Sequence, residues 1–102
     1  MKSWHTKEMD TLFEAILSLE SVEECYMFFE DACTVKELTD IAQRLKGARM
    51  LASGANYTEI GKETGMSTST ISRVNKCLKY GNEGYVKALE RVEYREKAAR
   101  RK

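Results

Sequence analysis

A glycine-centred break between two short helical patterns constrains the fold of this chain more than any other feature of its sequence. The stretch NYTEIGKETGMSTSTISRVNKCLKYG covers residues 56–81, and Gly65 stands where the first pattern ends. Glycine adopts the left-handed conformation without a steric penalty, and many helices end in this way. Ser67 is a good N-cap for the next helix because its oxygen accepts a backbone N–H. The stretch therefore predicts a helix, a tight turn and a second helix.

The apolar residues of the second helix fall on one face. Ile71, Val74 and Leu78 are separated by three and four residues, the spacing of a helical stripe. This stripe is expected to pack on Ile60 of the first helix, with Met66 in the turn. The residues then left on or near the outward side are Ser69, Thr70, Ser72, Arg73 and Lys76.

Small hydroxyl residues at the start of a helix suit contact with DNA. In a helix-turn-helix the second helix enters the major groove, and its first residues lie closest to the base edges. Hydroxyl groups bind base edges or phosphates, and the positive end of the helix dipole favours a phosphate neighbour. The residues predicted to bind DNA are Tyr57, Thr58, Ser67, Thr68, Ser69, Thr70, Ser72, Arg73 and Lys76, all within a helix-turn-helix at residues 56–79.

Charge is divided unevenly along the chain, although the total is only +1. Residues 1–33 contain 2 Lys and 8 Asp or Glu, a net charge of −6. Residues 34–102 contain 15 Lys or Arg and 8 Asp or Glu, a net charge of +7, and they end in a basic tail at residues 95–102. Because the basic part holds the predicted helix-turn-helix, double-stranded DNA is the expected partner.

The whole chain is expected to be all-α, with about six helices in a single domain. Its 102 residues include no proline, and apolar residues recur at intervals of three and four. A chain of this length buries only roughly two-thirds of its unfolded surface, which favours a dimer with a shared core. Residues 1–33 are expected to form the dimerisation helices, because the segment 22–29 is apolar around much of its circumference.

Local signals predict the other helix ends. Two capping boxes, each a Ser or Thr followed three residues later by Glu, begin the second and third helices. They are Ser21 with Glu24 and Thr34 with Glu37, and Gly54 closes the third helix. The first helix is expected over about residues 6–19, and the last from about residue 85 into a frayed basic tail.

Several classes of protein are disfavoured. Cys25, Cys33 and Cys77 form no CxxC pair and His5 is the single histidine, so no metal site is expected and the thiols are interpreted as buried or partly buried. No catalytic triad, carboxylate cluster or glycine-rich phosphate loop indicates an enzyme. No apolar run approaches the ~20 residues of a membrane span and no signal-peptide pattern is present, so a cytoplasmic protein without a membrane partner is predicted.

The order of these features resembles the Trp repressor superfamily, in particular its YerC/YecD-type branch of Trp-repressor-like proteins from Gram-positive bacteria. The likeness rests on LTDIAQRLKGARMLASGANYTEIGKETGMSTSTISRVNKCLKYG and covers roughly residues 34–89. A long helix, its glycine-terminated end, the helix-turn-helix and the TISR…LK run occur in the family's order. The resemblance implies a sequence-specific transcriptional regulator, expected to be a repressor, that works as an intertwined homodimer with interlocking N-terminal helices.

The resemblance also aligns Arg44 and Arg73 with the two arginines that flank the tryptophan corepressor of Trp repressor. Val74 stands where that repressor has a glycine, and the segment between Gly54 and Ile60 is one residue shorter. A β-branched side chain is expected to intrude on an indole. Tryptophan is therefore not expected to bind, and no cofactor is predicted. Arg44 is expected to be a surface residue or to hold a phosphate, and Arg73 to contact a base. The two together remain a candidate clamp for another ligand or a phosphate.

A helical adaptor for protein–protein interaction is the alternative interpretation. In that case the exposed Ser/Thr helix docks on another protein and no specific DNA binding occurs. Salt-sensitive DNA binding separates the two functions, because phosphate contacts release counterions.

Overall fold

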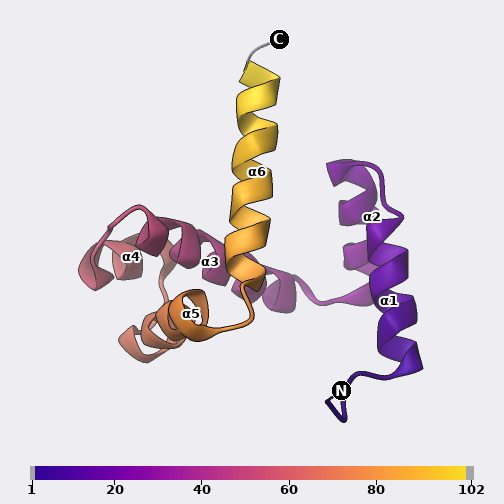
Figure 1. The fold of residues 1–102 in the computed structure, drawn as a ribbon, viewed down its shortest axis with the longest axis horizontal. Helices are drawn as coiled ribbons and strands as arrows, with labels where there is room; N and C mark the ends of the chain where they lie inside the picture. Colours follow the sequence, from indigo (N-terminus) through magenta and orange to yellow (C-terminus); the bar gives the residue numbers. More distant parts are fainter. Residues whose placement is uncertain (1, 101–102) are drawn as a thin grey trace. The chain divides into compact units, whose positions relative to one another are not determined.

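The computed structural model describes residues 2–100, which form six α-helices and no strand. The helices are α1 (Lys7–Leu17), α2 (Val22–Ala32), α3 (Val35–Ala52), α4 (Tyr57–Thr64), α5 (Thr68–Tyr80) and α6 (Gly84–Arg100) (Figure 1). The all-α class and the six helices are thereby confirmed. The chain divides into two compact units, Met1–Leu38 and Thr39–Lys102, and each is described by itself. Within residues 2–100, no helix combines the length and the hydropathy that crossing a membrane requires.

Side-chain caps begin the helices of the N-terminal unit. The Oγ1 atom of Thr6 accepts the backbone N–H of Met9 at 3.2 Å. Ser21 Oγ accepts the N–H of Glu24 at 3.1 Å, as predicted, but the Glu24 carboxylate accepts the N–H of Glu20 at 2.9 Å rather than that of Ser21. The box at Ser21 is therefore shifted by one residue on one side, and it still satisfies two backbone donors.

The third helix has both of its predicted ends. Thr34 and Glu37 form the complete capping box, with N–H···O distances of 2.8 Å and 3.1 Å. The hydrogen bond from the Thr34 N–H to the carboxylate lowers the pKa of Glu37, because it stabilises the charged form, and a side-chain hydrogen bond with Thr34 lowers it further. After α3, Gly54 has a positive φ of 92°, the left-handed conformation expected at a helix end.

The helices α1 and α2 bury none of their residues within the single chain. Six of their large apolar side chains are between 38% and 83% exposed: Leu12, Phe13, Leu17, Val22, Tyr26 and Met27. Phe28 and Phe29 are half-buried and meet edge to face, with ring centroids 5.1 Å apart. The apolar second helix is therefore present as predicted, and most of its apolar surface lies uncovered.

The core of the C-terminal unit lies where α3, α4 and α5 meet. Its apolar members are at most 3% exposed and are Ala48, Ile60, Ile71 and Val74. The predicted packing of Ile60 on the stripe of α5 is thus confirmed, with Met66 and Leu78 half-buried beside it. A Cβ atom added to Gly47 of α3 would lie 2.6 Å from Met66 Cε, so the methionine of the turn rests directly on the α3 backbone.

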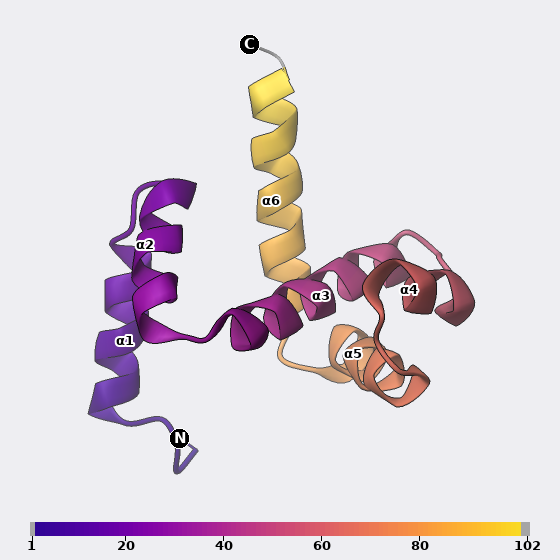
Figure 2. The ribbon, with the colours of Figure 1, turned by 180° about the vertical axis from the view of Figure 1, so that it is seen from behind.

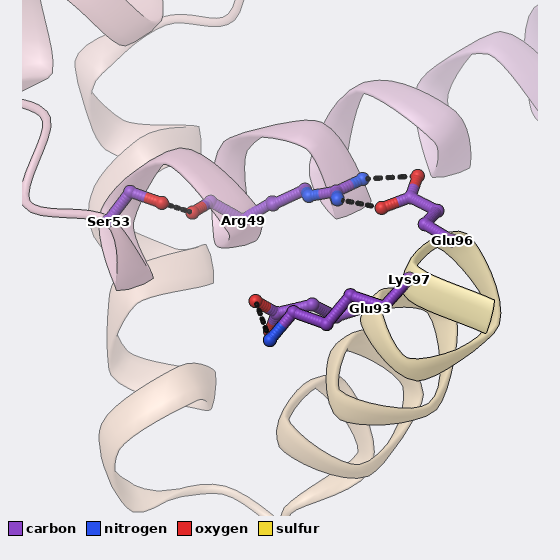
Figure 3. Close-up of polar contacts among 5 residues, drawn as sticks. All are labelled: Arg49, Ser53, Glu93, Glu96 and Lys97. Carbon is purple, nitrogen blue, oxygen red and sulfur yellow. Dashed lines mark hydrogen bonds and ion pairs between the residues drawn. The ribbon is translucent and has the colours of Figure 1, made fainter. Parts of the chain in front are cut away.

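The last helix is longer and more regular than predicted. Its residues are helical to Arg100, so residues 95–100 do not form the frayed tail that was expected, whereas residues 101–102 lie outside the described part. Two exposed ion pairs involve this part of α6: Arg49 of α3 binds the Glu96 carboxylate through both of its terminal nitrogens, and Lys97 lies 3.7 Å from Glu93 one turn earlier (Figure 3). The Arg49 hydrogen bond lowers the pKa of Glu96.

Candidate nucleic-acid interface

The first helix of the predicted helix-turn-helix begins with a capping box. Asn56 Oδ1 accepts the N–H of Glu59 at 2.9 Å, and Glu59 Oε1 accepts the N–H of Asn56 at 3.3 Å. This box fixes the start of α4 at Tyr57. This box was not predicted, although the spacing of Asn56 and Glu59 is the same as in the two predicted boxes at Ser21 and Thr34.

The turn between α4 and α5 is held by one left-handed glycine and one buried hydroxyl. Gly65 has φ 75° and ψ 2°, as predicted, and donates its N–H to the Gly61 carbonyl at 2.9 Å. Thr64 is only 3% exposed, and its hydroxyl donates to the Ile60 carbonyl at 2.7 Å and accepts the Met66 N–H at 3.1 Å. Thr64 therefore connects the last turn of α4 to the chain that follows it, a role that the sequence analysis did not find.

Ser67 caps α5 and organises the hydroxyl groups beside it. Its Oγ atom accepts the N–H of Thr70 at 3.2 Å, donates to Thr70 Oγ1 at 3.0 Å and lies 3.1 Å from Ser69 Oγ. A hydroxyl has one donor and two acceptor positions, so Ser67 is fully used when Ser69 donates to it. The predicted cap is confirmed, and three of the hydroxyls in the Ser/Thr run form one cluster.

The outward face of α5 is polar and carries only positive charge. The side chains exposed on it are Thr68, Ser69, Ser72, Arg73 and Lys76, whereas Thr70 is half-buried. The helix contains Arg73, Lys76 and Lys79 and no acidic residue. Cations and small hydroxyls therefore share the face of α5 that lies opposite its buried stripe. Figure 2 shows the course of α5 beside α4, the helix on which that stripe packs.

The two residues predicted on α4 differ in their surroundings. Thr58 is exposed. Tyr57 is half-buried, and its hydroxyl accepts a hydrogen bond of 3.2 Å from Asn75 Nδ2 on α5. Thr58 therefore lies on the surface, whereas Tyr57 belongs to the contact between the two helices.

The predicted arginine pair lines one cavity. Arg44 of α3 and Arg73 of α5 border a hollow of about 280 Å³ that is completed by Thr70, Val74, Cys77 and Tyr85. Both arginines therefore border the same hollow, with Val74 in its wall, and their use as a ligand or phosphate clamp stays a prediction. Cys77 was expected to be at least partly buried, but its side chain is exposed. The inward position is taken by Leu78, which continues the apolar stripe one residue later.

Comparison with known proteins agrees with this architecture. The family model described as Trp repressor protein matches residues 7–93. The chain belongs to the Trp repressor family. The match reaches α1 and α2, which the resemblance over residues 34–89 did not include. Members of this family are DNA-binding regulators and not enzymes.

Several relatives within the Trp repressor family are similar over most of the chain. A Bacillus subtilis (strain 168) protein named YerC, itself uncharacterised, is 58% identical over 86 residues, 84% of this chain and 83% of its own. A crystal structure of a candidate Trp repressor from Staphylococcus aureus is 48% identical with a TM-score of 0.82, covering 86% of this chain and 88% of that one. A TrpR-like protein from Eubacterium eligens ATCC 27750 is 47% identical with a TM-score of 0.84, covering 87% and 92%.

Proposed function

We propose that the protein is a sequence-specific DNA-binding transcriptional regulator, acting as a repressor and as a homodimer that presents α5 to the major groove. The observation that carries this proposal is the exposed face of α5, where small hydroxyls and cations lie together without an acidic residue. Small side chains allow the helix backbone to approach the bases, and the positive face attracts the phosphates on both sides of the groove. Because its ligand is DNA, the protein is proposed to work in the cytoplasm.

The hydroxyl groups at the start of α5 divide into two sets. Those of Ser67, Ser69 and Thr70 bind one another and the helix backbone. Those of Thr68 and Ser72 make no hydrogen bond within residues 2–100 and are exposed, one turn apart on one face. We infer that Thr68 and Ser72 bind base edges, while the cluster at Ser67 holds the helix end in a fixed form.

The cations of α5 are proposed to have separate tasks. A guanidinium fork such as that of Arg73 matches the two acceptors of guanine in the major groove. The ammonium group of Lys76 suits a phosphate contact, because it is a point charge on a flexible stem. Thr58 is exposed near the start of α4 and is proposed as a further phosphate contact.

A second copy of the chain is proposed to cover α1 and α2. Each of these helices has 11 residues and buries none of them in the single chain. Helices shorter than about 12–15 residues are marginally stable in water, so most of their stability must come from packing. The exposed apolar side chains of α1 and α2 supply a surface for that packing, and the family match over residues 7–93 includes both helices.

The DNA-binding proposal is tested by fluorescence anisotropy with duplexes selected from genomic fragments. Replacing Thr68 and Ser72 together with Ala should reduce the preference for the selected duplex over a random one. Lys76→Ala should weaken binding to both duplexes and lower the salt slope by about one unit, because one phosphate contact is lost. Lys7→Ala, in the acidic N-terminal unit, is the matched control and should leave the slope unchanged. If DNA affinity depends neither on the salt concentration nor on the substitutions in α5, the alternative function, an adaptor for protein–protein interaction, is supported instead.

The dimer is tested by light scattering at micromolar concentration, where twice the chain mass of 11.7 kDa is expected. Leu17 and Met27 are 83% and 65% exposed in the single chain, so Glu at either position should leave the chain itself undisturbed and dissociate the dimer. Thr11→Glu, on the opposite face of α1, should leave the mass unchanged. A monomer formed by the unaltered protein contradicts the proposal.

A further inference from the structure

We propose that Tyr57 and Asn75 fix the angle between α4 and α5, so that Tyr57 acts on DNA recognition through Asn75 rather than by touching DNA. The inference rests on the proposed DNA-binding function and assigns two positioning residues to it. The observation behind it is the hydrogen bond of 3.2 Å from Asn75 Nδ2 to the Tyr57 hydroxyl, between residues 18 positions apart. Both side chains are half-buried where α4 and α5 pack together.

This hydrogen bond lies away from the turn that joins the two helices. The turn connects the end of α4 to the start of α5, whereas Tyr57 is the first residue of α4 and Asn75 is about two turns into α5. With a rise of about 1.5 Å per residue, each partner lies roughly 10 Å along its helix from the turn. The helices α4 and α5 are therefore connected at two separate points, the turn and the Tyr57–Asn75 hydrogen bond. The second connection fixes the angle between the helices, which the turn alone leaves adjustable.

The apolar contacts between the helices do not replace this constraint. Ile60, Ile71 and Val74 fill the space between α4 and α5, but the hydrophobic effect that drives their contact has no direction. A hydrogen bond weakens steeply when its angle or length changes. Partial burial of Tyr57 and Asn75 also reduces competition from water, which strengthens the directional contribution of their bond.

A small change of the angle would displace the residues proposed to contact DNA. If the bond is lost and the two ends separate by about 1 Å over an arm of roughly 10 Å, the angle changes by about 6°. Ser72 and Arg73, which are proposed to bind bases, lie roughly 6–8 Å along α5 from the turn and would move by more than half of this separation, about 0.6–0.8 Å. Binding groups need to be held within about 0.5 Å of their working position, so base contacts should suffer. Attraction to phosphates acts over longer distances and should change little.

A double-mutant cycle tests the proposal. Tyr57→Phe, Asn75→Ala and the double variant are compared for affinity to the selected duplex and to a random duplex, well below their melting temperatures. Each single change should lower affinity for the selected duplex about three- to tenfold, the range expected for one hydrogen bond, and the double variant should lose no more than either single one. Affinity for random DNA and the salt slope should stay constant. Tyr94→Phe, which alters a tyrosine that is 76% exposed on α6, is the matched control.

Asn75→Asp provides the conservative rescue. Its carboxylate can accept the Tyr57 O–H, which restores the contact with the direction of donation reversed. The added negative charge should weaken binding to both duplexes, and the ratio of the two affinities should return to that of the unaltered protein.

Other outcomes overturn the proposal in different ways. If Tyr57→Phe lowers affinity for the selected duplex by the same factor in the unaltered protein and in Asn75→Ala, Tyr57 touches DNA directly. Equal losses on both duplexes indicate a merely structural role. If the unaltered protein prefers no duplex at all, the proposed function itself is wrong, whereas a preference combined with additive losses refutes the positioning role alone.

Discussion

Replacing Thr64 with valine tests how the turn between α4 and α5 is held. Valine has almost the shape of threonine, so packing is retained while the hydroxyl is lost. In the structure this hydroxyl donates to the Ile60 carbonyl at 2.7 Å and accepts the Met66 N–H at 3.1 Å, in a side chain that is 3% exposed. Ile60 lies inside α4, where the helical ladder also uses its carbonyl, so Met66 N–H is the group left without a partner.

The size of the effect follows from these contacts. A buried donor without a partner costs about 1–3 kcal/mol, and the lower half of that range applies because Met66 is half-buried. The additional methyl group of valine offsets up to about 0.8 kcal/mol. A net loss of about 1 kcal/mol is therefore expected in the free energy of unfolding for Thr64→Val, which corresponds to a fall of about 4–8 °C in Tm for a domain of this size.

Thr64→Ser is the matched control, because it keeps the hydroxyl and removes only the methyl group. Its stability should fall by a similar amount, about 1 kcal/mol, through lost packing. Amide hydrogen exchange separates the two variants: the Met66 N–H should lose protection in Thr64→Val and keep it in Thr64→Ser. Melting is compared at one protein concentration, since association stabilises a dimer. Unchanged Met66 protection in Thr64→Val refutes the role assigned to the hydroxyl.

Three further results are expected. Because the Arg49 hydrogen bond lowers the pKa of Glu96 in the folded chain, the stability it contributes is present above the ordinary glutamate pKa and is lost as pH falls through the lowered value. Unfolding free energy should fall more steeply between about pH 5 and pH 3 in the unaltered protein than in Glu96→Gln, and equal slopes contradict this. Cys77 is exposed, so a thiol reagent should modify it faster than the other two cysteines; mass spectrometry that finds another order contradicts its placement. L-Tryptophan at millimolar concentration should leave Tm and DNA affinity unchanged, because Val74 occupies part of the cavity beside Arg73; a rise of several degrees that Arg73→Ala abolishes restores the corepressor site.

The features predicted correctly from the sequence are those whose cause lies within a few residues. Gly65 ends α4 because the next backbone step is left-handed, and Ser67 caps α5 through an N–H three residues ahead. The stripe of Ile71 and Val74 also follows from helical spacing alone. Each of these signals depends only on neighbouring residues, so it can be recognised in the sequence without knowledge of the fold.

The features missed by the sequence analysis depend on residues brought together by packing. The sequence contains many hydroxyl residues, and nothing in it distinguishes Thr64. Its two hydrogen bonds hold the turn between α4 and α5 because the side chain is buried, and that burial is seen only in the fold. Tyr57 and Asn75 are 18 positions apart, and no periodicity links them. Leu78 was correctly placed in the stripe and is half-buried, whereas Cys77 was expected to be at least partly buried and is exposed, because helical spacing does not say which neighbours cover a residue beside the stripe.

The most direct measurement of the central claim is selection of binding sites from a pool of random duplexes with the unaltered full-length protein. If a dimer presents two copies of α5 to the major groove, the enriched duplexes should contain inverted half-sites whose centres lie about 10–10.5 base pairs apart or a multiple of that spacing. Enrichment should disappear when Thr68 and Ser72 are both replaced with Ala. A pool that stays random, or an enriched site without two-fold symmetry, would contradict a symmetric dimer that recognises DNA through α5.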